Sequence, residues 1–125
     1  MSSSKTSTRT ILVVDDDFDV REALCDVLRE EGFSVDAAAD GVEALDYLRS
    51  HEAPRLILLD LMMPRMDGAQ FRTEQRRDPS ISAVPVVLLS ADTRIVEMTT
   101  TLAASGYLKK PVDLHRLLDT VKRFN

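Results

Sequence analysis

Polar side chains of a few types stand at the ends of four apolar runs in this sequence. Asp15 and Asp16 follow the first run, and Asp60, Ser90 and Lys110 end three later ones. Three carboxylates brought together repel one another unless a cation shares their site. Oxygen ligands alone suit Mg²⁺ or Mn²⁺ better than zinc, and a metal beside a lysine suits a group with negatively charged oxygens. If the runs meet at one edge, these residue types indicate phosphoryl chemistry.

The elements that must bring these residues together alternate along the chain. Short apolar runs are typical of strands covered on both faces, and the segments between them carry apolar residues at helical spacing. We expect strands over 10–14, 33–39, 55–60, 84–90 and 106–110, and helices over 18–31, 41–49, 68–77, 92–104 and 113–124.

This alternation predicts an α/β fold with right-handed crossovers and one parallel sheet covered by helices on both faces. Ligands of such sheets bind outside the carboxyl ends of the strands, where the five polar residues would meet. Local residue types support the helices: Asp40 to Glu43 matches a capping box, and Gly32 is placed to end the first helix. Asp17 could serve simply as the cap of that helix.

Length and composition exclude several classes of protein. The chain has 125 residues, 44% hydrophobic and 30% charged, which fits one globular domain. Its net charge of −5 argues against binding to nucleic acid, its single Cys25 cannot form an internal disulfide, and it holds no apolar run long enough to span a membrane. We expect a mobile polar tail over 1–9, a domain over 10–125, and a cytoplasmic location with no membrane contact.

Four stretches resemble the receiver domain of two-component response regulators. They are ILVVDD at 11–16, LLDLMMPRMDG at 58–68, LLSA at 88–91 and GYLKKP at 106–111. Each is a modest signal alone, but together, in this order and each at a strand end, they are highly specific. The resemblance runs from about Thr10 to the C-terminus and implies the flavodoxin-like (βα)5 fold with strand order 2-1-3-4-5.

The resemblance also implies a role for each residue of the motifs. Asp60 would accept the phosphoryl group. The side chains of Asp16 and Asp60 and the main-chain carbonyl of Met62 would bind Mg²⁺, for which Mn²⁺ could substitute, and Asp15 would hold the metal through water.

Residues of the later motifs would act on the phosphoryl group after its transfer. Ser90, Ala91 and Lys110 would bind its oxygens, and Ser90 and Tyr107 would change conformation together. The Lys110–Pro111 peptide bond would be cis, as is usual in the family.

A receiver domain is a signalling module rather than an enzyme, although it has self-phosphorylation and autodephosphorylation chemistry of its own. The implied partners are a histidine kinase or phosphotransfer protein, and a downstream protein bound at the face of helix 92–104, strand 106–110 and helix 113–124. We expect a monomer or a phosphorylation-dependent dimer. Met62 and Asp92 occupy positions that tune dephosphorylation in the family.

Three alternatives remain open from the sequence. The chain could be a stand-alone regulator or a receiver cut from a longer regulator or hybrid kinase. It could be a Mg²⁺-dependent phosphotransferase that works through an aspartyl-phosphate, but 125 residues leave little chain for a substrate cap. A flavin or nucleotide binder would need a phosphate-binding loop where the acidic residues 15–17 stand.

Two expectations concern local structure. Three consecutive threonines at 99–101 are poor helix formers, so helix 92–104 should be the least protected against hydrogen exchange. Gly68 should serve the backbone near a helix start rather than chemistry.

Overall fold

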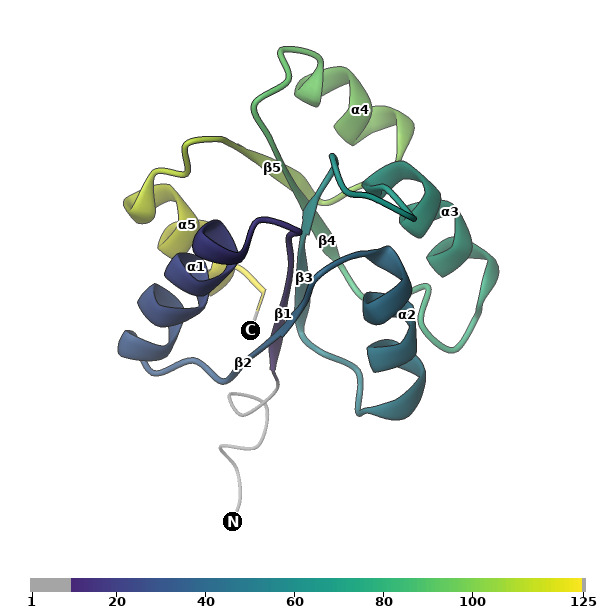
Figure 1. Ribbon diagram of the computed structural model, residues 1–125, viewed down its shortest axis with the longest axis horizontal. Helices are drawn as coiled ribbons and strands as arrows, with labels where there is room; N and C mark the ends of the chain where they lie inside the picture. The colour runs from purple at the N-terminus through teal and green to yellow at the C-terminus, as the bar shows by residue number, and fades with distance from the viewer. Residues whose placement is uncertain (1–9, 125) are drawn as a thin grey trace.

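The computed structural model describes residues 10–124, so the predicted tail over 1–9 lies outside the described residues. Strands and helices alternate along this part of the chain (Figure 1). The strands are β1 (Ile11–Val14), β2 (Val35–Ala38), β3 (Leu56–Asp60), β4 (Val86–Ser90) and β5 (Gly106–Lys109). The helices are α1 (Phe18–Glu30), α2 (Gly41–Ser50), α3 (Gly68–Arg77), α4 (Ile95–Thr101) and α5 (Leu114–Lys122).

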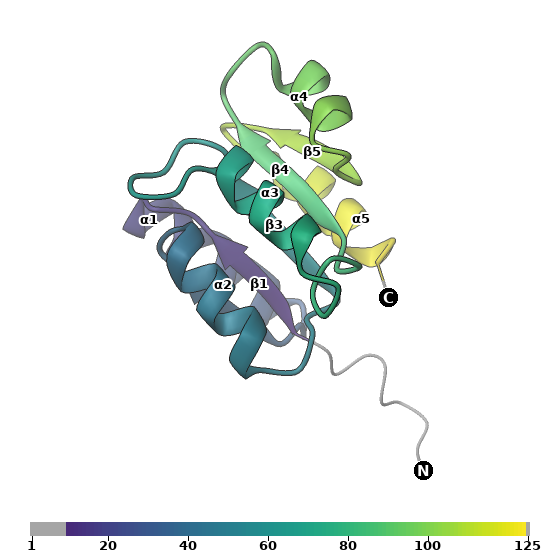
Figure 2. The same cartoon turned by 90° about the vertical axis from the view of Figure 1, so that its right-hand side faces the viewer.

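The strands form one parallel sheet in the order β2-β1-β3-β4-β5. Helices α1 and α5 cover one face, and α2, α3 and α4 cover the other (Figures 1 and 2). The predicted fold class and strand order are therefore confirmed: this is the flavodoxin-like α/β fold.

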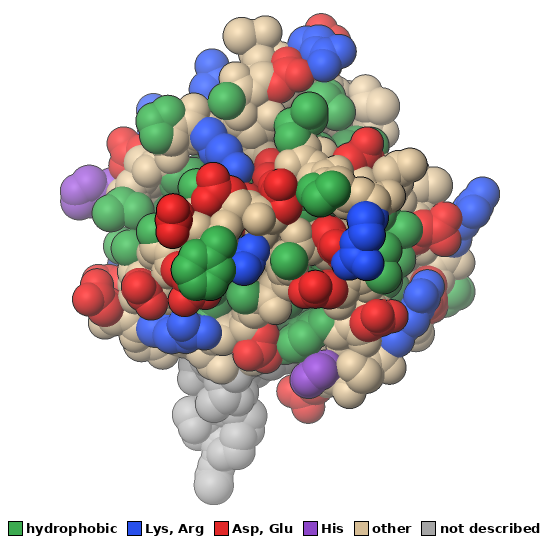
Figure 3. All heavy atoms as spheres, viewed as in Figure 1, with side chains coloured by type: hydrophobic (Ala, Val, Ile, Leu, Met, Phe, Trp, Pro, Cys, Tyr) green, Lys and Arg blue, Asp and Glu red, His purple; other side chains and the backbone are tan. Residues whose placement is uncertain are grey.

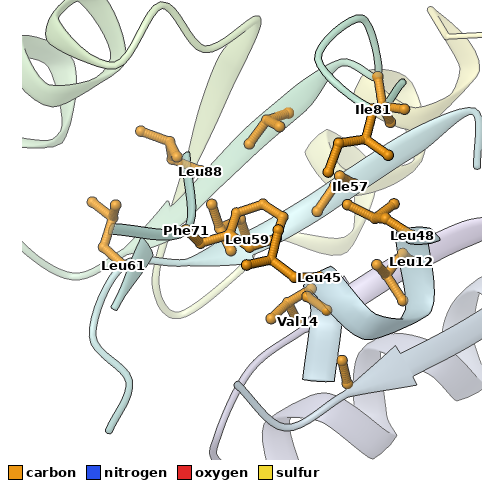
Figure 4. Packing of buried hydrophobic residues seen from close by; sticks show 14 of the residues in the cluster. Leu12, Val14, Leu45, Leu48, Ile57, Leu59, Leu61, Phe71, Ile81 and Leu88 are labelled. Carbon is orange, nitrogen blue, oxygen red and sulfur yellow. The ribbon is translucent and has the colours of Figure 1, made fainter. Parts of the chain in front are cut away.

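Alternate residues of the central strands supply two separate cores. Leu12 and Leu59 point to the α2–α3–α4 side, while Ile11 and Leu58 point to the α1–α5 side. All four are fully buried, which explains why the strands read as continuous apolar runs. Figure 4 shows the first core, with Phe71 of α3 packed against the sheet.

Aspartates begin four of the helices. Asp17, Asp40, Asp67 and Asp113 each accept a hydrogen bond from a backbone N–H of the first turn. The reciprocal capping box predicted at Asp40 is wrong in detail, because the Glu43 side chain accepts from Ala39 N instead (3.0 Å). The complete box lies at α3, between Asp67 and Gln70. Gly32 follows α1 with a left-handed φ of +94°, as its predicted role requires.

The largest boundary difference is in α4, which spans Ile95–Thr101 rather than 92–104. Its start is delayed because the Asp92 side chain accepts hydrogen bonds from Arg94, which holds a turn there (Arg94 N to Oδ1, 2.8 Å). It ends early because Ala103 adopts a left-handed φ of +52°. Strand β5 ends at Lys109, one residue before the predicted end at Lys110.

Within residues 10–124, no helix is long and apolar enough to cross a membrane.

Candidate functional site

The carboxyl ends of β1 and β3 bring three aspartates together. One carboxylate oxygen each from Asp15, Asp16 and Asp60 lies within 4.8 Å of the others. Asp15 and Asp60 are buried, whereas Asp16 is exposed and opens the cluster to solvent. In the space-filling view, acidic side chains gather around the start of α1 on this face (Figure 3). The convergence expected from the strand ends is therefore found.

Lys110 supplies the positive charge nearest to these carboxylates. Its Nζ donates to Asp15 Oδ2 at 2.8 Å and lies 3.5 Å from Asp60 Oδ2. Its backbone N–H donates to Ser90 O at 3.0 Å, which continues the β4–β5 pairing by one residue. The Lys110–Pro111 peptide bond is cis.

The charges of this cluster do not cancel, since three carboxylates face one ammonium group. Burial and the neighbouring Asp15 carboxylate raise the pKa of Asp60 to about 7, although Lys110 opposes the shift. Burial lowers the pKa of Lys110, but its contacts with Asp15 and Asp60 outweigh that effect and raise it overall. Lys110 therefore stays protonated beside Asp60, but it does not fully stabilise the ionised form of the Asp60 carboxylate.

The loop after β3 begins by folding over Asp60. Met62 N donates to Asp60 Oδ1 at 3.2 Å, while the Met62 side chain is exposed. Gly68 packs closely against the end of β3, since a Cβ atom there would come within 2.9 Å of Asp60 O and Leu61 Cα. Since backbone atoms cannot easily move aside, position 68 accepts only glycine, in line with the backbone role predicted for it.

Within residues 10–124, the side chains of Ser90 and Tyr107 make no hydrogen bond to the three carboxylates. Ser90 is buried at the end of β4, and its Oγ accepts a hydrogen bond from Asp92 N at 3.0 Å. Ala91 follows on the surface, and Tyr107 on β5 is 41% exposed. The Ser90 oxygen thus accepts a hydrogen bond from its own turn, which leaves its O–H group able to donate elsewhere.

The donor set fits a hard divalent cation. Its atoms are carboxylate oxygens, two of the three side chains are buried, and the raised pKa of Asp60 marks unbalanced negative charge. A divalent cation relieves like-charge repulsion of this kind and prefers oxygen ligands. The acidic cluster therefore supports a divalent metal site.

Sequence reasoning missed several arginines near these elements. Arg21 Nη1 donates to Asp15 O at 2.7 Å, which fixes the backbone between the two acidic residues and α1. Arg65, in the loop between β3 and α3, forms an ion pair with Asp40, the N-cap of α2. Arg72 is buried in α3 and contacts the end of α4. Only Arg72 left a trace in the sequence, because it and Gln75 occupy the helical face on which Phe71 is buried.

Comparison with known proteins identifies the class to which this fold and cluster belong. The model of the response regulator receiver domain family matches residues 11–122, and the chain belongs to that family. The expected resemblance is thereby confirmed.

Individual relatives come from several bacteria. Response regulator MprA of Mycobacterium tuberculosis (strain CDC 1551 / Oshkosh) is 43% identical over 110 residues, which make up 86% of this chain and 46% of MprA. The chain thus spans about half the length of the curated relatives it matches.

Solved structures agree with the fold over nearly the whole chain. The chemotaxis protein CheY4 of Vibrio cholerae has a TM-score of 0.85 at 29% identity, covering 94% of this chain and 99% of CheY4. A response regulator receiver protein from Pseudomonas putida has a TM-score of 0.87 at 30% identity, covering 98% and 99% of the two chains.

Proposed function

We propose that Asp60 accepts a phosphoryl group from the phosphohistidine of a histidine kinase or phosphotransfer protein. The observation that carries this proposal is the buried Asp60 carboxylate with Lys110 Nζ 3.5 Å from its oxygen and two further acidic side chains beside it. An Asp60 oxygen attacks phosphorus, and the P–N bond of the donor breaks. The electron pair stays on the imidazole nitrogen, which takes up a proton, and Asp60 becomes an acyl phosphate.

Charge neutralisation and positioning supply most of the acceleration in such a transfer. Asp16, Asp60 and the Met62 main-chain carbonyl would hold Mg²⁺, or Mn²⁺ in its place, and Asp15 would hold it through water. Bound there, the cation neutralises negative charge on the phosphoryl oxygens. Lys110 approaches from the β5 side and neutralises a further oxygen, with Ser90 and the backbone of Ala91 as additional donors.

The signal leaves the site through Ser90 and Tyr107. Phosphorylation replaces one negative charge by nearly two and adds strong acceptor oxygens. The Ser90 hydroxyl then donates to a phosphoryl oxygen, and the half-exposed Tyr107 turns inward. This changes the face formed by α4, β5 and α5, where a downstream protein binds.

The proposal places the chain in the cytoplasm, as a monomer or as a dimer that forms on phosphorylation. The same site would work in a stand-alone regulator or within a longer one. The acidic composition of the chain argues for a protein rather than a nucleic acid as the direct partner.

Phosphorylation by a small-molecule donor tests the acceptor directly. Incubation with acetyl phosphate and Mg²⁺ should add one phosphoryl mass to the intact protein, and Asp60→Asn should add none. Asp26→Asn, an exposed carboxylate on α1, is the matched control and should be labelled like the wild type. Labelling that persists in Asp60→Asn overturns the assignment.

Lys110→Ala separates phosphorylation from the response. The variant should keep Mg²⁺ binding while losing the change at the α4–β5–α5 face, because Lys110 no longer holds the phosphoryl group on Asp60 beside Ser90. Amide NMR shifts at Tyr107 on phosphorylation measure that change. A full shift at Tyr107 in Lys110→Ala contradicts the role given to the lysine.

A further inference from the structure

An ion pair joins the β3–α3 loop to the start of α2. Arg65 Nε donates to Asp40 Oδ2 at 2.7 Å, and Arg65 Nη2 contacts the same oxygen. The side chain of Asp40 is only 6% exposed, whereas that of Arg65 is 59% exposed. The other oxygen, Asp40 Oδ1, accepts from Glu43 N at 3.0 Å as the helix cap. One buried carboxylate thus serves the helix with one oxygen and the loop with the other.

Asp40 stays ionised in this setting. Burial disfavours its ionised form, but the hydrogen bonds from Glu43 N and the Arg65 guanidinium outweigh burial and lower its pKa. The contact with Arg65 is therefore a charge-assisted hydrogen bond at neutral pH, stronger than one between neutral groups.

The backbones of the loop and the helix also touch at this point. A Cβ atom on Gly41 would lie 2.8 Å from Met66 Cγ and 2.9 Å from Met66 O, so the loop approaches as closely as a glycine allows. Arg65 itself has a left-handed φ of +63°, which disfavours a side chain of this kind by about 1 kcal/mol. Asparagine or glycine would fit that backbone better, so the arginine is held there by what its side chain contacts.

The same loop carries the groups next to the phosphoacceptor. It leaves β3 at Asp60, whose Oδ1 accepts from Met62 N, and returns to the sheet where Gly68 N donates to Leu61 O at 3.0 Å. Between these two fixed points, the Arg65–Asp40 pair holds the outer part of the loop against α2, next to the packing of Met66 on Gly41. Met62 and Arg65 are thus three residues apart in one short loop that is held at both ends.

We propose that Arg65, acting through Asp40, is a positioning residue that holds the Met62 main chain in place for the divalent cation. This inference rests on the proposed function of Asp60. Arg65 touches neither the carboxylate cluster nor the phosphoryl group, and its effect passes through the loop.

Mg²⁺ affinity measured by calorimetry is the primary test, since it needs no phosphorylation. Arg65→Ala should weaken Mg²⁺ binding about tenfold, the lower end of what loss of an outer-shell contact costs a metal site. Arg65→Lys keeps one charged donor and should recover part of the affinity. Arg49→Ala, which breaks the surface pair of Arg49 Nε with Asp78 Oδ2 (3.3 Å), is the matched control and should bind Mg²⁺ like the wild type.

Arg65→Asn separates the ion pair from the backbone conformation. Asparagine tolerates the left-handed φ but cannot replace the salt bridge, so it should bind Mg²⁺ as weakly as the alanine variant. If Arg65→Asn restores wild-type affinity, the backbone and not the ion pair matters, and the inference is overturned. Wild-type affinity in Arg65→Ala overturns it as well.

Phosphorylation kinetics complete the test. With acetyl phosphate, Arg65→Ala should need about tenfold more Mg²⁺ for half-maximal rate and reach nearly the wild-type rate at saturation. A lower saturated rate with unchanged Mg²⁺ dependence contradicts positioning through the metal. Failure of the wild type to bind Mg²⁺ or to be labelled would instead refute the proposed function.

Discussion

Two clusters of buried charge in this domain differ in how completely their members are paired. Around Arg72, the guanidinium donates to Leu102 O (2.9 Å), Ala103 O (2.7 Å) and Gln75 Oε1 (2.8 Å). Gln75 in turn donates to two carbonyls of the segment leading to β4, Ile81 O and Val84 O, both at 3.0 Å. Burial lowers the pKa of Arg72, but every nitrogen of its guanidinium has an acceptor.

Around Asp60 the balance is reversed, because acceptors outnumber donors. Asp15 and Asp60 share one ammonium group, and Asp60 gains only one backbone hydrogen bond, from Met62. Buried polar groups stabilise a fold when they are paired and destabilise it when they are not. The Arg72 cluster therefore stabilises the fold, while the Asp60 cluster leaves negative charge that a divalent cation would neutralise.

Removing the arginine from the paired cluster should have the largest effect on stability. Arg72→Ala leaves three acceptors without their donor and should lower the free energy of unfolding by about 2–4 kcal/mol, measured by urea denaturation. Arg76→Ala, an exposed arginine one helical turn away, should change it by less than about 0.5 kcal/mol. A loss below about 1 kcal/mol for Arg72→Ala would show that the pairing contributes little.

Removing a charge from the Asp60 cluster should instead increase the free energy of unfolding. Without metal at about pH 8, Asp60→Asn should raise the free energy of unfolding by about 1–3 kcal/mol, because a buried repelled charge is lost. The pKa of Asp60 is about 7 in the folded protein against an ordinary 3.8. The folded state binds the extra proton between these values, so the wild type should lose stability as pH rises from about 4 to about 7.

The pH dependence is the check on this prediction. We expect urea denaturation at about pH 5 and pH 8 to give a smaller difference in the free energy of unfolding between Asp60→Asn and the wild type at the lower pH. Wild-type Asp60 is protonated there and no longer carries the repelled charge. Asp26→Asn should show no such change. A constant or reversed difference between the two pH values would mean that Asp60 is not destabilised by its surroundings.

Adding metal should relieve the same imbalance. At ten times its dissociation constant, Mg²⁺ should stabilise the wild type by about 1.4 kcal/mol, seen as a rise in the thermal midpoint. Asp16→Asn should have nearly the same metal-free stability, since Asp16 is exposed, but it should lose the response to Mg²⁺. An equal Mg²⁺ response in this variant would exclude Asp16 as a ligand.

The smallest effect concerns the two ends of α4. Arg72 contacts the carbonyls beyond the C-terminus of α4, while the N-cap residue Arg94 makes no side-chain capping bond. We expect amide hydrogen exchange to be faster in α4 than in the other helices of residues 10–124, with its first turn exchanging before its last. Slower exchange in α4 than in α1 would contradict both the threonine argument and the missing cap.

Much of this molecule was predictable because its signals are local. Buried strands read as apolar runs, aspartates mark the helix starts, and the parallel sheet then places Asp15, Asp60 and Lys110 at one edge. What escaped prediction depends on partners distant in the chain. The carbonyls bound by Arg72 are about 30 residues away, and Asp40 was expected as a cap, but its second partner, Arg65, lies 25 residues further on.

The boundaries of α4 show the same limit. The threonines at 99–101 predict weak helical propensity, but the end of α4 is set by a left-handed Ala103 and by a side chain from α3. The place of Arg72 on the buried face of α3 could be read from the sequence, but the carbonyls that it binds could not.

The unequal hydrogen bonding at the two ends of α4 also limits how that helix can move. Arg72 bonds the carbonyls at its C-terminal end, whereas its N-terminal end has no side-chain cap and is held through the buried Ile95, so we expect the helix to rotate about its C-terminal end rather than slide along its axis. Seven residues of α-helix are about 10 Å long, so a rotation of about 10° around the C-terminal end carries the N-terminal end through about 2 Å. A partner that binds α4 would then meet the largest displacement beside the carboxyl ends of the strands and almost none at the C-terminal end of the helix.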